Sequence, residues 1–182
     1  VVQTLGMLFY MPLAAFFPLM TSDYFGGSAW HGSAVETVYA VGMLVSATLF
    51  GTVLKVRRHL AVAYLGYIGI GITALVSGLM PPTMTGWMVF AVACGFMGAF
   101  GTMYGIALNT YMQTTIDPHR MGRAFSTMNM VQSVASPVGL LVASPVAEAT
   151  GVARWFLIAG IGIVMVTGAG FFYELCRHRK RK

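Results

Sequence analysis

Hydrophobic residues dominate six long runs of this chain, and short polar stretches separate the runs. The runs cover about residues 2–22, 33–54, 60–80, 86–113, 123–147 and 153–175. A transmembrane helix needs roughly 20 mostly apolar residues, so each run is long enough to span a membrane. The runs lack the strict alternation of barrel strands, and backbone polar groups in lipid must be satisfied within the segment. The pattern therefore predicts an all-α membrane protein with six transmembrane helices.

The composition agrees with a lipid surrounding. Of the 182 residues, 57% are hydrophobic and 9% are charged, with a mean hydropathy of +0.76. A soluble domain has about a quarter of its residues charged. The net charge of +6 would fit nucleic acid, but the cations are not interleaved with aromatic residues on one basic face. We therefore expect the lipid bilayer, and no nucleic acid, as a partner. No basic segment precedes the first run, which argues against a secretory signal, and the start at Val1 leads us to expect a fragment whose upstream part is missing.

The basic residues fall on one side of the membrane if all six runs span it. They are Lys55, Arg57 and Arg58 after the second run, Arg120 and Arg123 before the fifth, and five in a tail at 176–182. Only Arg154 falls on the other side. Short loops rich in Lys and Arg stay in the cytoplasm, so this distribution predicts that both termini and the basic tail are cytoplasmic.

Polar side chains occur inside four of the six runs. The cavity candidates are Gln3, Tyr10, Glu36, Tyr39, Asn109, Gln113, Asn129 and Gln132. Spacings of three, four and seven residues place Asn129, Gln132, Ser133 and Ser136 on one helical stripe. Polar groups in hydrocarbon usually face the bundle interior or a watery cavity. The alternative is hydrogen bonding between helices, which is common for Asn, Gln and Ser. The third and sixth runs have almost no strong polar groups, so we expect them at the periphery, facing lipid.

Glu36 is the acidic residue closest to being embedded. An intramembrane carboxylate is a candidate proton or cation site. The alternative is that Glu36 is simply favourable near the wet N-terminal end of its helix.

Glycine and proline mark special places in the runs. Gly101 and Gly105 have the GxxxG spacing, which predicts a close helix contact. Pro81-Pro82 predicts a turn between the third and fourth runs. Four further prolines lie within runs, where they can kink a helix: Pro12, Pro18, Pro137 and Pro145.

Enzyme chemistry is not evident. There is no Walker motif, no HExxH and no nucleophile elbow, and Cys94 and Cys176 are far apart. The four histidines have no ligand spacing. We therefore predict no catalytic residue, no metal and no cofactor, and we rank a membrane enzyme last among the alternatives.

Several motifs occur in a recognisable order. TYMQTTIDPHRMGRAFS contains Gln113, Asp117-Pro118 and Gly122-Arg123, and it precedes SPVGLLVASPVAEATG; YMPLAAFFPLMTSDYFGGSA lies near the start. These stretches resemble parts of major facilitator superfamily transporters of the drug and macrolide efflux branch. The first resembles the link between helices ten and eleven, and the second resembles helix eleven. The stretch near the start resembles helix seven with its outer loop. Gly51 with Lys55, Arg57 and Arg58 is similar to the weaker second copy of the family's loop motif. The strong copy has Asp where this chain has Lys55, so a gating salt bridge centred on Asp does not carry over.

The resemblance implies the C-terminal six-helix half of a twelve-helix transporter in the bacterial plasma membrane. In such a transporter, substrate binds between two halves that rock to alternate access. The implied activity is secondary-active, proton-coupled efflux of an amphiphilic small molecule such as a drug or macrolide, hence antiport and antibiotic resistance. The implied cytoplasmic gate and loop residues are Gly51, Lys55, Arg57, Arg58, Asp117, Arg120, Gly122 and Arg123. The expected partner is a missing N-terminal half. The alternative is a self-assembling six-helix protein, either a homodimeric half-transporter or an assembly without transport.

Overall fold

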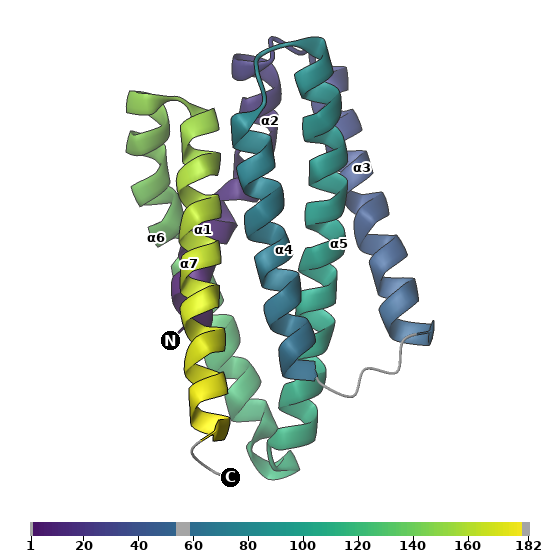
Figure 1. Ribbon diagram of the computed structural model, residues 1–182, viewed down its shortest axis with the longest axis vertical. Coiled ribbons are helices and arrows are strands. Elements are labelled where there is room, and N and C mark those ends of the chain that lie inside the picture. The colour runs from purple at the N-terminus through teal and green to yellow at the C-terminus, as the bar shows by residue number, and fades with distance from the viewer. Residues whose placement is uncertain (1, 54–58, 180–182) are drawn as a thin grey trace.

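Every regular element in the described part of the chain is a helix (Figure 1). The computed structural model describes residues 2–53 and 59–179, and side chains over residues 6, 9–51 and 59–171. The elements are α1 (Val2–Ala15), α2 (Phe17–Leu19), the π-helix η1 (Met20–Tyr24), α3 (Ala29–Thr48), the π-helix η2 (Leu49–Val53), α4 (His59–Leu79), α5 (Met84–Thr115), α6 (Pro118–Thr150) and α7 (Val152–Arg179). The prediction of an all-α fold is therefore confirmed for these residues.

Five helices in the described part are long and apolar enough to cross a membrane. They are α3 extended to Gly51, then α4, α5, α6 and the part of α7 up to Phe171. The first predicted run is not one continuous helix, because the chain breaks at Phe16 between α1 and α2. Pro12 and Pro18 lie on either side of the break, and neither has an N–H to donate to the preceding turn. The structure thus gives five continuous candidate spans, and a sixth span remains a prediction.

The helices pack in a defined order. α5 lies between α3 and α4, α4 also packs along α7, and α1 packs against α6 and α7. In Figure 1 the α5–α6 turn and the last described turns of α7 lie at the lower end, whereas the α4–α5 and α6–α7 turns lie at the upper end. This arrangement follows the alternating course predicted for the runs, and it puts the α5–α6 turn and the α6–α7 turn at opposite ends of the bundle.

The turns use the residues that end helices. Thr83 accepts a hydrogen bond at 3.1 Å from the Gly86 N–H and so caps α5, directly after the Pro81-Pro82 turn that the sequence predicts. Gly151 ends α6 with a φ of 93°, which favours glycine. The α6–α7 turn therefore needs only this one residue.

The closest helix contact differs from the predicted one. A side chain on Gly42 of α3 would collide with the carbonyl oxygen of Gly95 on α5. Gly101 instead faces the hydroxyl of Tyr10, and Gly105 has nothing within 4 Å. Among the described residues, the close contact of α3 with α5 therefore lies at Gly95 and Gly98, whereas Gly101 meets α1 through the Tyr10 hydroxyl and Gly105 meets no other helix.

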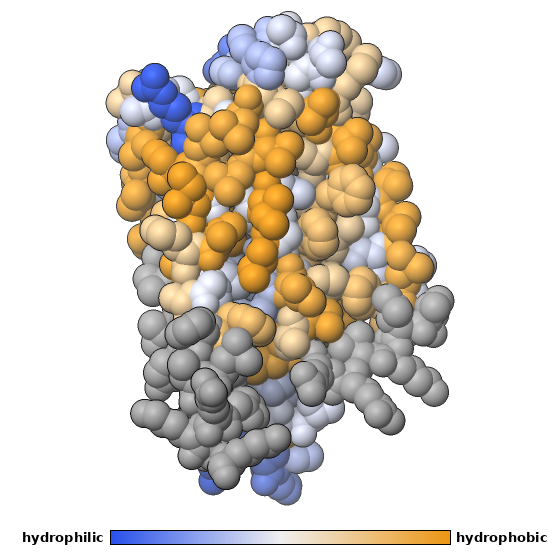
Figure 2. All heavy atoms as spheres, in the orientation of Figure 1, coloured by the Kyte–Doolittle hydropathy of each residue, from blue (hydrophilic) through white to orange (hydrophobic). Residues whose placement is uncertain are grey.

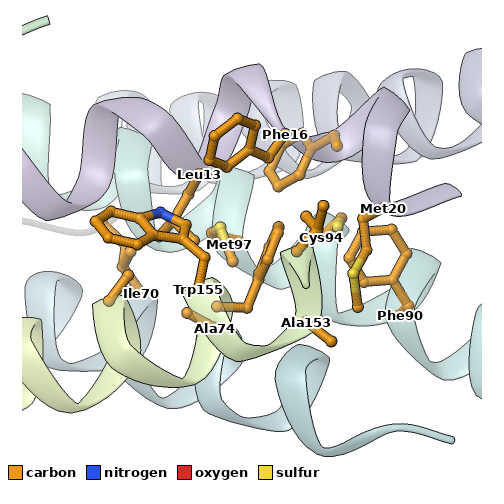
Figure 3. Packing of buried hydrophobic residues seen from close by; sticks show 14 of the residues in the cluster. Leu13, Phe16, Met20, Ile70, Ala74, Phe90, Cys94, Met97, Ala153 and Trp155 are labelled. Carbon is orange, nitrogen blue, oxygen red and sulfur yellow. The ribbon is translucent and has the colours of Figure 1, made fainter. Parts of the chain in front are cut away.

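The core lies between the first run (α1, α2 and η1), α4, α5 and α7. Figure 3 shows its side chains converging from these elements; they include Leu13, Phe16, Met20, Ile70, Ala74, Phe90, Cys94, Met97, Ala153 and Trp155. In their most apolar stretches, α4 is 50% buried and α7 is 44% buried, against 22% for α6 and 11% for α3. Within this chain, the two helices expected at the periphery are thus the most covered. Small residues such as Gly71 and Gly160 let them pack closely against each other.

The exposed surface still fits a lipid surrounding. Figure 2 shows hydrophobic residues over the middle of one face and hydrophilic residues towards its two ends. The large exposed side chains of α4 are all apolar: Leu65, Ile72, Val76 and Leu79. The chain therefore forms part of a multi-pass membrane protein.

Candidate functional site

Two tyrosines from different helices meet inside the bundle. Tyr10 of α1 and Tyr39 of α3 place their hydroxyl oxygens 3.1 Å apart, within hydrogen-bonding distance. Both side chains are half-buried, and the ring of Phe17 lies 5.4 Å from that of Tyr39 between centroids. The sequence predicts both tyrosines on a polar path, and the structure brings these two candidates into contact.

Two further tyrosines extend this contact. The ring of Tyr67 on α4 lies 4.6 Å from that of Tyr104 on α5 and 6.4 Å from that of Tyr10, measured between centroids. We call Tyr10, Tyr39, Tyr67 and Tyr104 the tyrosine cluster. The ring of Tyr67 covers Gly6 of α1, where an added methyl group would collide with it. The cluster therefore joins four helices: α1, α3, α4 and α5.

Two buried hydroxyls, one in the cluster and one on α5, have no hydrogen-bond partner among the described residues. The Tyr67 hydroxyl is buried, and so is Oγ1 of Thr102 on α5; neither has a hydrogen-bond partner among the described residues. Leaving a buried hydroxyl unsatisfied costs about 1–3 kcal/mol, and most buried polar side-chain atoms in proteins are bonded. A polar group that reached either hydroxyl could therefore bond to it without breaking an existing hydrogen bond.

One face of α5 leads from the cluster to the surface. It carries Gly98, Gly101, Gly105, Asn109 and Gln113 at spacings of three and four residues. Gly98 lies against the backbone of Tyr39, and a Cβ on Gly101 would be 3.0 Å from the Tyr10 hydroxyl oxygen. Gly105 meets nothing within 4 Å, and the two amides beyond it are exposed. This face therefore changes from tightly packed to open along a single helix.

The polar stripe of α6 also lies on the surface of the bundle. Gln132 is half-buried, whereas Asn129, Ser133 and Ser136 are exposed. α6 packs against α1 and α7, and it touches α5 much less. Within the described part of the chain, neither Asn129 nor Gln132 bonds to another helix. Hydrogen bonding between the described helices therefore does not account for the stripe.

The other predicted polar residues take separate positions. Glu36 is exposed on α3, about one turn before Tyr39, and no hydrogen bond joins it to the tyrosine cluster among the described residues. Gln3 belongs to α1, but its side chain lies outside the described residues. Gly51 is exposed in η2, and the three cations of its loop motif lie outside the described residues: Lys55, Arg57 and Arg58.

The α5–α6 turn shows one clear structural role. The Asp117 carboxylate accepts a hydrogen bond at 3.2 Å from the His119 N–H, and Pro118 is the first residue of α6. Asp117 is therefore the N-cap of α6. The remaining predicted gate residues of this turn are all exposed: Arg120, Gly122 and Arg123. Their part in cytoplasmic closure stays a prediction.

The described residues offer no metal site. They contain no group of three or more His, Cys, Asp or Glu side chains placed to hold a metal ion. Cys94 is buried without a disulfide in the core, and the side chain of Cys176 lies outside the described residues.

The sequence analysis did not predict Tyr67, Tyr104 or Gly98 as site residues. Tyr67 lies in a run that has almost no strong polar group, so that run was expected to face lipid. The useful signal was local: Tyr67 lies between Gly66 and Gly69, which let α5 approach, and both glycines lie against α5 in the structure. A tyrosine among glycines in an apolar helix marks a buried contact, because small neighbours allow another helix to cover the ring.

Sequence comparison relates this chain to bacterial efflux proteins. It is 34% identical over 165 residues to macrolide efflux protein A of Streptococcus pyogenes, covering 91% of this chain and 40% of that protein. It is 34% identical over 139 residues to macrolide efflux protein A of Enterococcus faecalis, covering 76% and 42%. It is 25% identical over 138 residues to the multidrug efflux pump Tap of Mycolicibacterium fortuitum, covering 76% and 33%. The chain thus spans less than half the length of these relatives. No family model and no solved structure matches it.

Proposed function

Since this chain is a homologue of the macrolide and multidrug efflux proteins of the major facilitator superfamily, we propose that it is the C-terminal six-helix half of a secondary-active efflux transporter. The proposal rests on the 34% identity that extends over 91% of the chain. Because the chain spans 40% of that relative, transport is assigned to the complete protein and not to this chain alone.

The tyrosine cluster and the open faces of α5 and α6 form one wall of the substrate path. The hydroxyls and amides bind polar groups of the cargo, and the bare backbone at Gly105 leaves room for its bulk. A site that combines a few polar groups with much apolar surface suits an amphiphilic small molecule such as a drug or macrolide. Asn109, Gln113, Asn129 and Gln132 contribute to this wall because nothing in the described bundle covers them fully.

Transport proceeds by alternating access, with two halves rocking around a site near the midplane, and proton entry drives export. The ends that carry the basic turns and tail face the cytoplasm, by the preference of short Lys- and Arg-rich loops for that side. Glu36 then lies towards the outer side of the membrane.

The proposed wall is tested by filling the open position on α5. Gly105→Leu is compared with Gly168→Leu, because both glycines are helical and have nothing within 4 Å, but Gly168 belongs to α7. In cells that produce the complete protein, we expect Gly105→Leu to reduce macrolide export at unchanged expression, while Gly168→Leu exports normally. Equal export by both variants would remove Gly105 from the substrate path.

Proton coupling is tested separately in everted membrane vesicles. Macrolide uptake into the vesicles should collapse when an uncoupler removes the proton gradient and the membrane potential. Uptake that persists under these conditions contradicts proton coupling but leaves the wall assignment intact.

A homodimer of six-helix units is the rival assembly, and the exposed amides of α5 favour covering by some second bundle in either case. The intact mass of the native polypeptide separates the two. A mass near twice that of this chain supports a covalently joined second half. A mass equal to this chain supports the homodimer.

A further inference from the structure

The N-terminus of α3 is capped in an unusual way. Ser28 is the N-cap residue, and its backbone N–H donates to Nδ1 of His31 at 3.2 Å. The Ser28 hydroxyl oxygen also lies 2.9 Å from the same nitrogen. In the common capping box, the residue three positions after the cap is Glu or Gln, whose side chain accepts this bond at every ordinary pH. Here the acceptor is an imidazole nitrogen, which accepts only while it carries no proton.

His31 also connects α3 to its surroundings. Its ring lies 4.8 Å from the ring of Trp87 on α5, nearly perpendicular to it, and its Cβ would lie 3.1 Å from a Cβ added to Gly27. Gly27 in turn donates its N–H to the Thr21 carbonyl oxygen of η1 at 2.9 Å. The cap therefore lies where η1, the loop at 25–28, α3 and α5 meet.

Protonation changes this junction in two ways. A protonated Nδ1 no longer accepts the Ser28 backbone N–H, so this donor loses its partner, and the Nδ1–H can bond only to the Ser28 hydroxyl oxygen 2.9 Å away. The positive charge also lies in the first turn of α3, where the helix dipole disfavours cations. The Trp87 ring attracts a cation, so the imidazolium remains on α5 while the loop is released from it.

Few other charges act on His31. On η1, Asp23 is exposed and accepts a bond from the Ser22 hydroxyl, and the Tyr24 hydroxyl donates to the Met80 carbonyl oxygen. On α3, Glu36 is exposed more than one turn further along. The turn at 80–83 and the first turn of α5 contain no titratable side chain. His31 is the histidine among the described residues of this junction, and histidine is the residue type whose charge changes near neutral pH.

We propose that His31 is a pH-sensitive latch, whose protonation removes the acceptor of the Ser28 backbone N–H and so loosens the connection between η1 and α3. Under the proposed orientation the latch senses the outer medium. The latch itself depends only on the Ser28–His31–Trp87 geometry, so its failure and the failure of the proposed efflux function are separate results.

Hydrogen–deuterium exchange on the complete protein in lipid nanodiscs tests the latch. Amide exchange in peptides covering residues 25–31 is measured at pH 5.5 and 7.5 and divided by the intrinsic exchange rate of the unfolded peptide at each pH. The wild type should exchange about fivefold to tenfold faster at the lower pH after this correction, the range expected for losing one helix cap. His31→Gln supplies a Gln at the usual capping position, so it should stay protected at both values. His119→Gln, on the exposed first turn of α6, should behave as the wild type.

Three results would overturn the latch. One is a wild type whose corrected exchange does not change with pH. Another is a His31→Gln variant that keeps the same pH response as the wild type. A third is fast corrected exchange at both pH values in both His31→Gln and His31→Glu. Each variant supplies a hydrogen-bond acceptor at this position, so such a result would show that the cap does not depend on one.

Discussion

The contact of α3 with α5 at Gly42 and Gly95 makes a sharp prediction about stability. In Gly42→Ala, the new methyl group would collide with the Gly95 carbonyl oxygen, so the clash is with backbone and no rotamer change relieves it. In Gly95→Ala, the new methyl group would lie 2.9 Å from Cγ1 of Val38, which is a side chain. In Gly105→Ala, the methyl group enters open space. The three substitutions are chemically identical and differ only in what they meet.

The expected magnitudes follow from two opposing terms. Overpacking costs about 1–3 kcal/mol, whereas replacing Gly by Ala inside a helix gains about 1 kcal/mol. Gly42→Ala should take the high end of the cost and lose about 1–2 kcal/mol net. Gly95→Ala should be close to neutral, and Gly105→Ala should gain up to about 1 kcal/mol. At about 2–4 °C per kcal/mol, Gly42→Ala should lower the thermal midpoint by about 2–8 °C.

The assay is the thermal midpoint of the complete protein in detergent, with fluorescence-detected size exclusion as the readout. Adding Val38→Ala should restore any loss in Gly95→Ala, because it removes the methyl group that the new side chain meets. The same addition should leave Gly42→Ala unchanged. If Gly42→Ala and Gly105→Ala have the same midpoint, the described crossing of α3 and α5 is wrong.

Three further predictions use the same preparation. Tyr67→Phe removes a buried hydroxyl that has no hydrogen-bond partner among the described residues, so it should raise the free energy of unfolding by about 1 kcal/mol or more. Tyr10→Phe breaks the 3.1 Å bond to Tyr39 and should lower the free energy of unfolding by about 0.5–1.5 kcal/mol. The reverse order of stability would contradict the described packing of the tyrosine cluster. Asp117→Ala should cost about 0.5–2 kcal/mol through loss of the α6 cap, while Asp117→Asn keeps most of the stability, and equal midpoints would remove the cap. Cys94 is 0% exposed and should react with a maleimide only after denaturation in SDS, as read by the mass of the peptide that contains Cys94; labelling of that peptide in the native protein would show that α5 is not packed as described.

The sequence predicts the helices well because their determinants are local. Continuous apolar stretches and helix-ending residues such as Asp117 and Thr83 set the five continuous spans, and their ends agree with the predicted runs to within a few residues for α4 and α5. The break at Phe16 is signalled only by the flanking prolines. Proline shows that a hydrogen bond is missing but does not say whether the helix bends, breaks or continues; α6 continues through Pro137 and Pro145.

The candidate site is harder to predict because it depends on which helices become neighbours. Tyr10 and Tyr39 could be selected as polar residues in apolar runs, but their contact requires the crossing of α1 and α3. Tyr67 has a local signal in Gly66 and Gly69, which indicate that another helix covers its ring, but its contact with α1 at Gly6 depends on which helices become neighbours. The spacing of Gly101 and Gly105 is compatible with a close helix contact and with an open surface. Glycine has no side chain in either case, so the sequence alone does not distinguish the two.

The exposed polar side chains of α5 and α6 indicate what kind of surface surrounds this bundle. Asn109, Gln113 and Asn129 are exposed on helices that are apolar enough to lie in a membrane. A polar side chain facing hydrocarbon without a hydrogen bond is costly, whereas the same side chain facing a water-filled path or another polar surface is not. Asn129 lies on α6, and α3 and α6 are the least covered of the five spans, whereas Asn109 and Gln113 lie towards the C-terminal end of α5. The exposed amides and the low burial of α3 and α6 both support the proposal that a second bundle packs against this unit in the membrane.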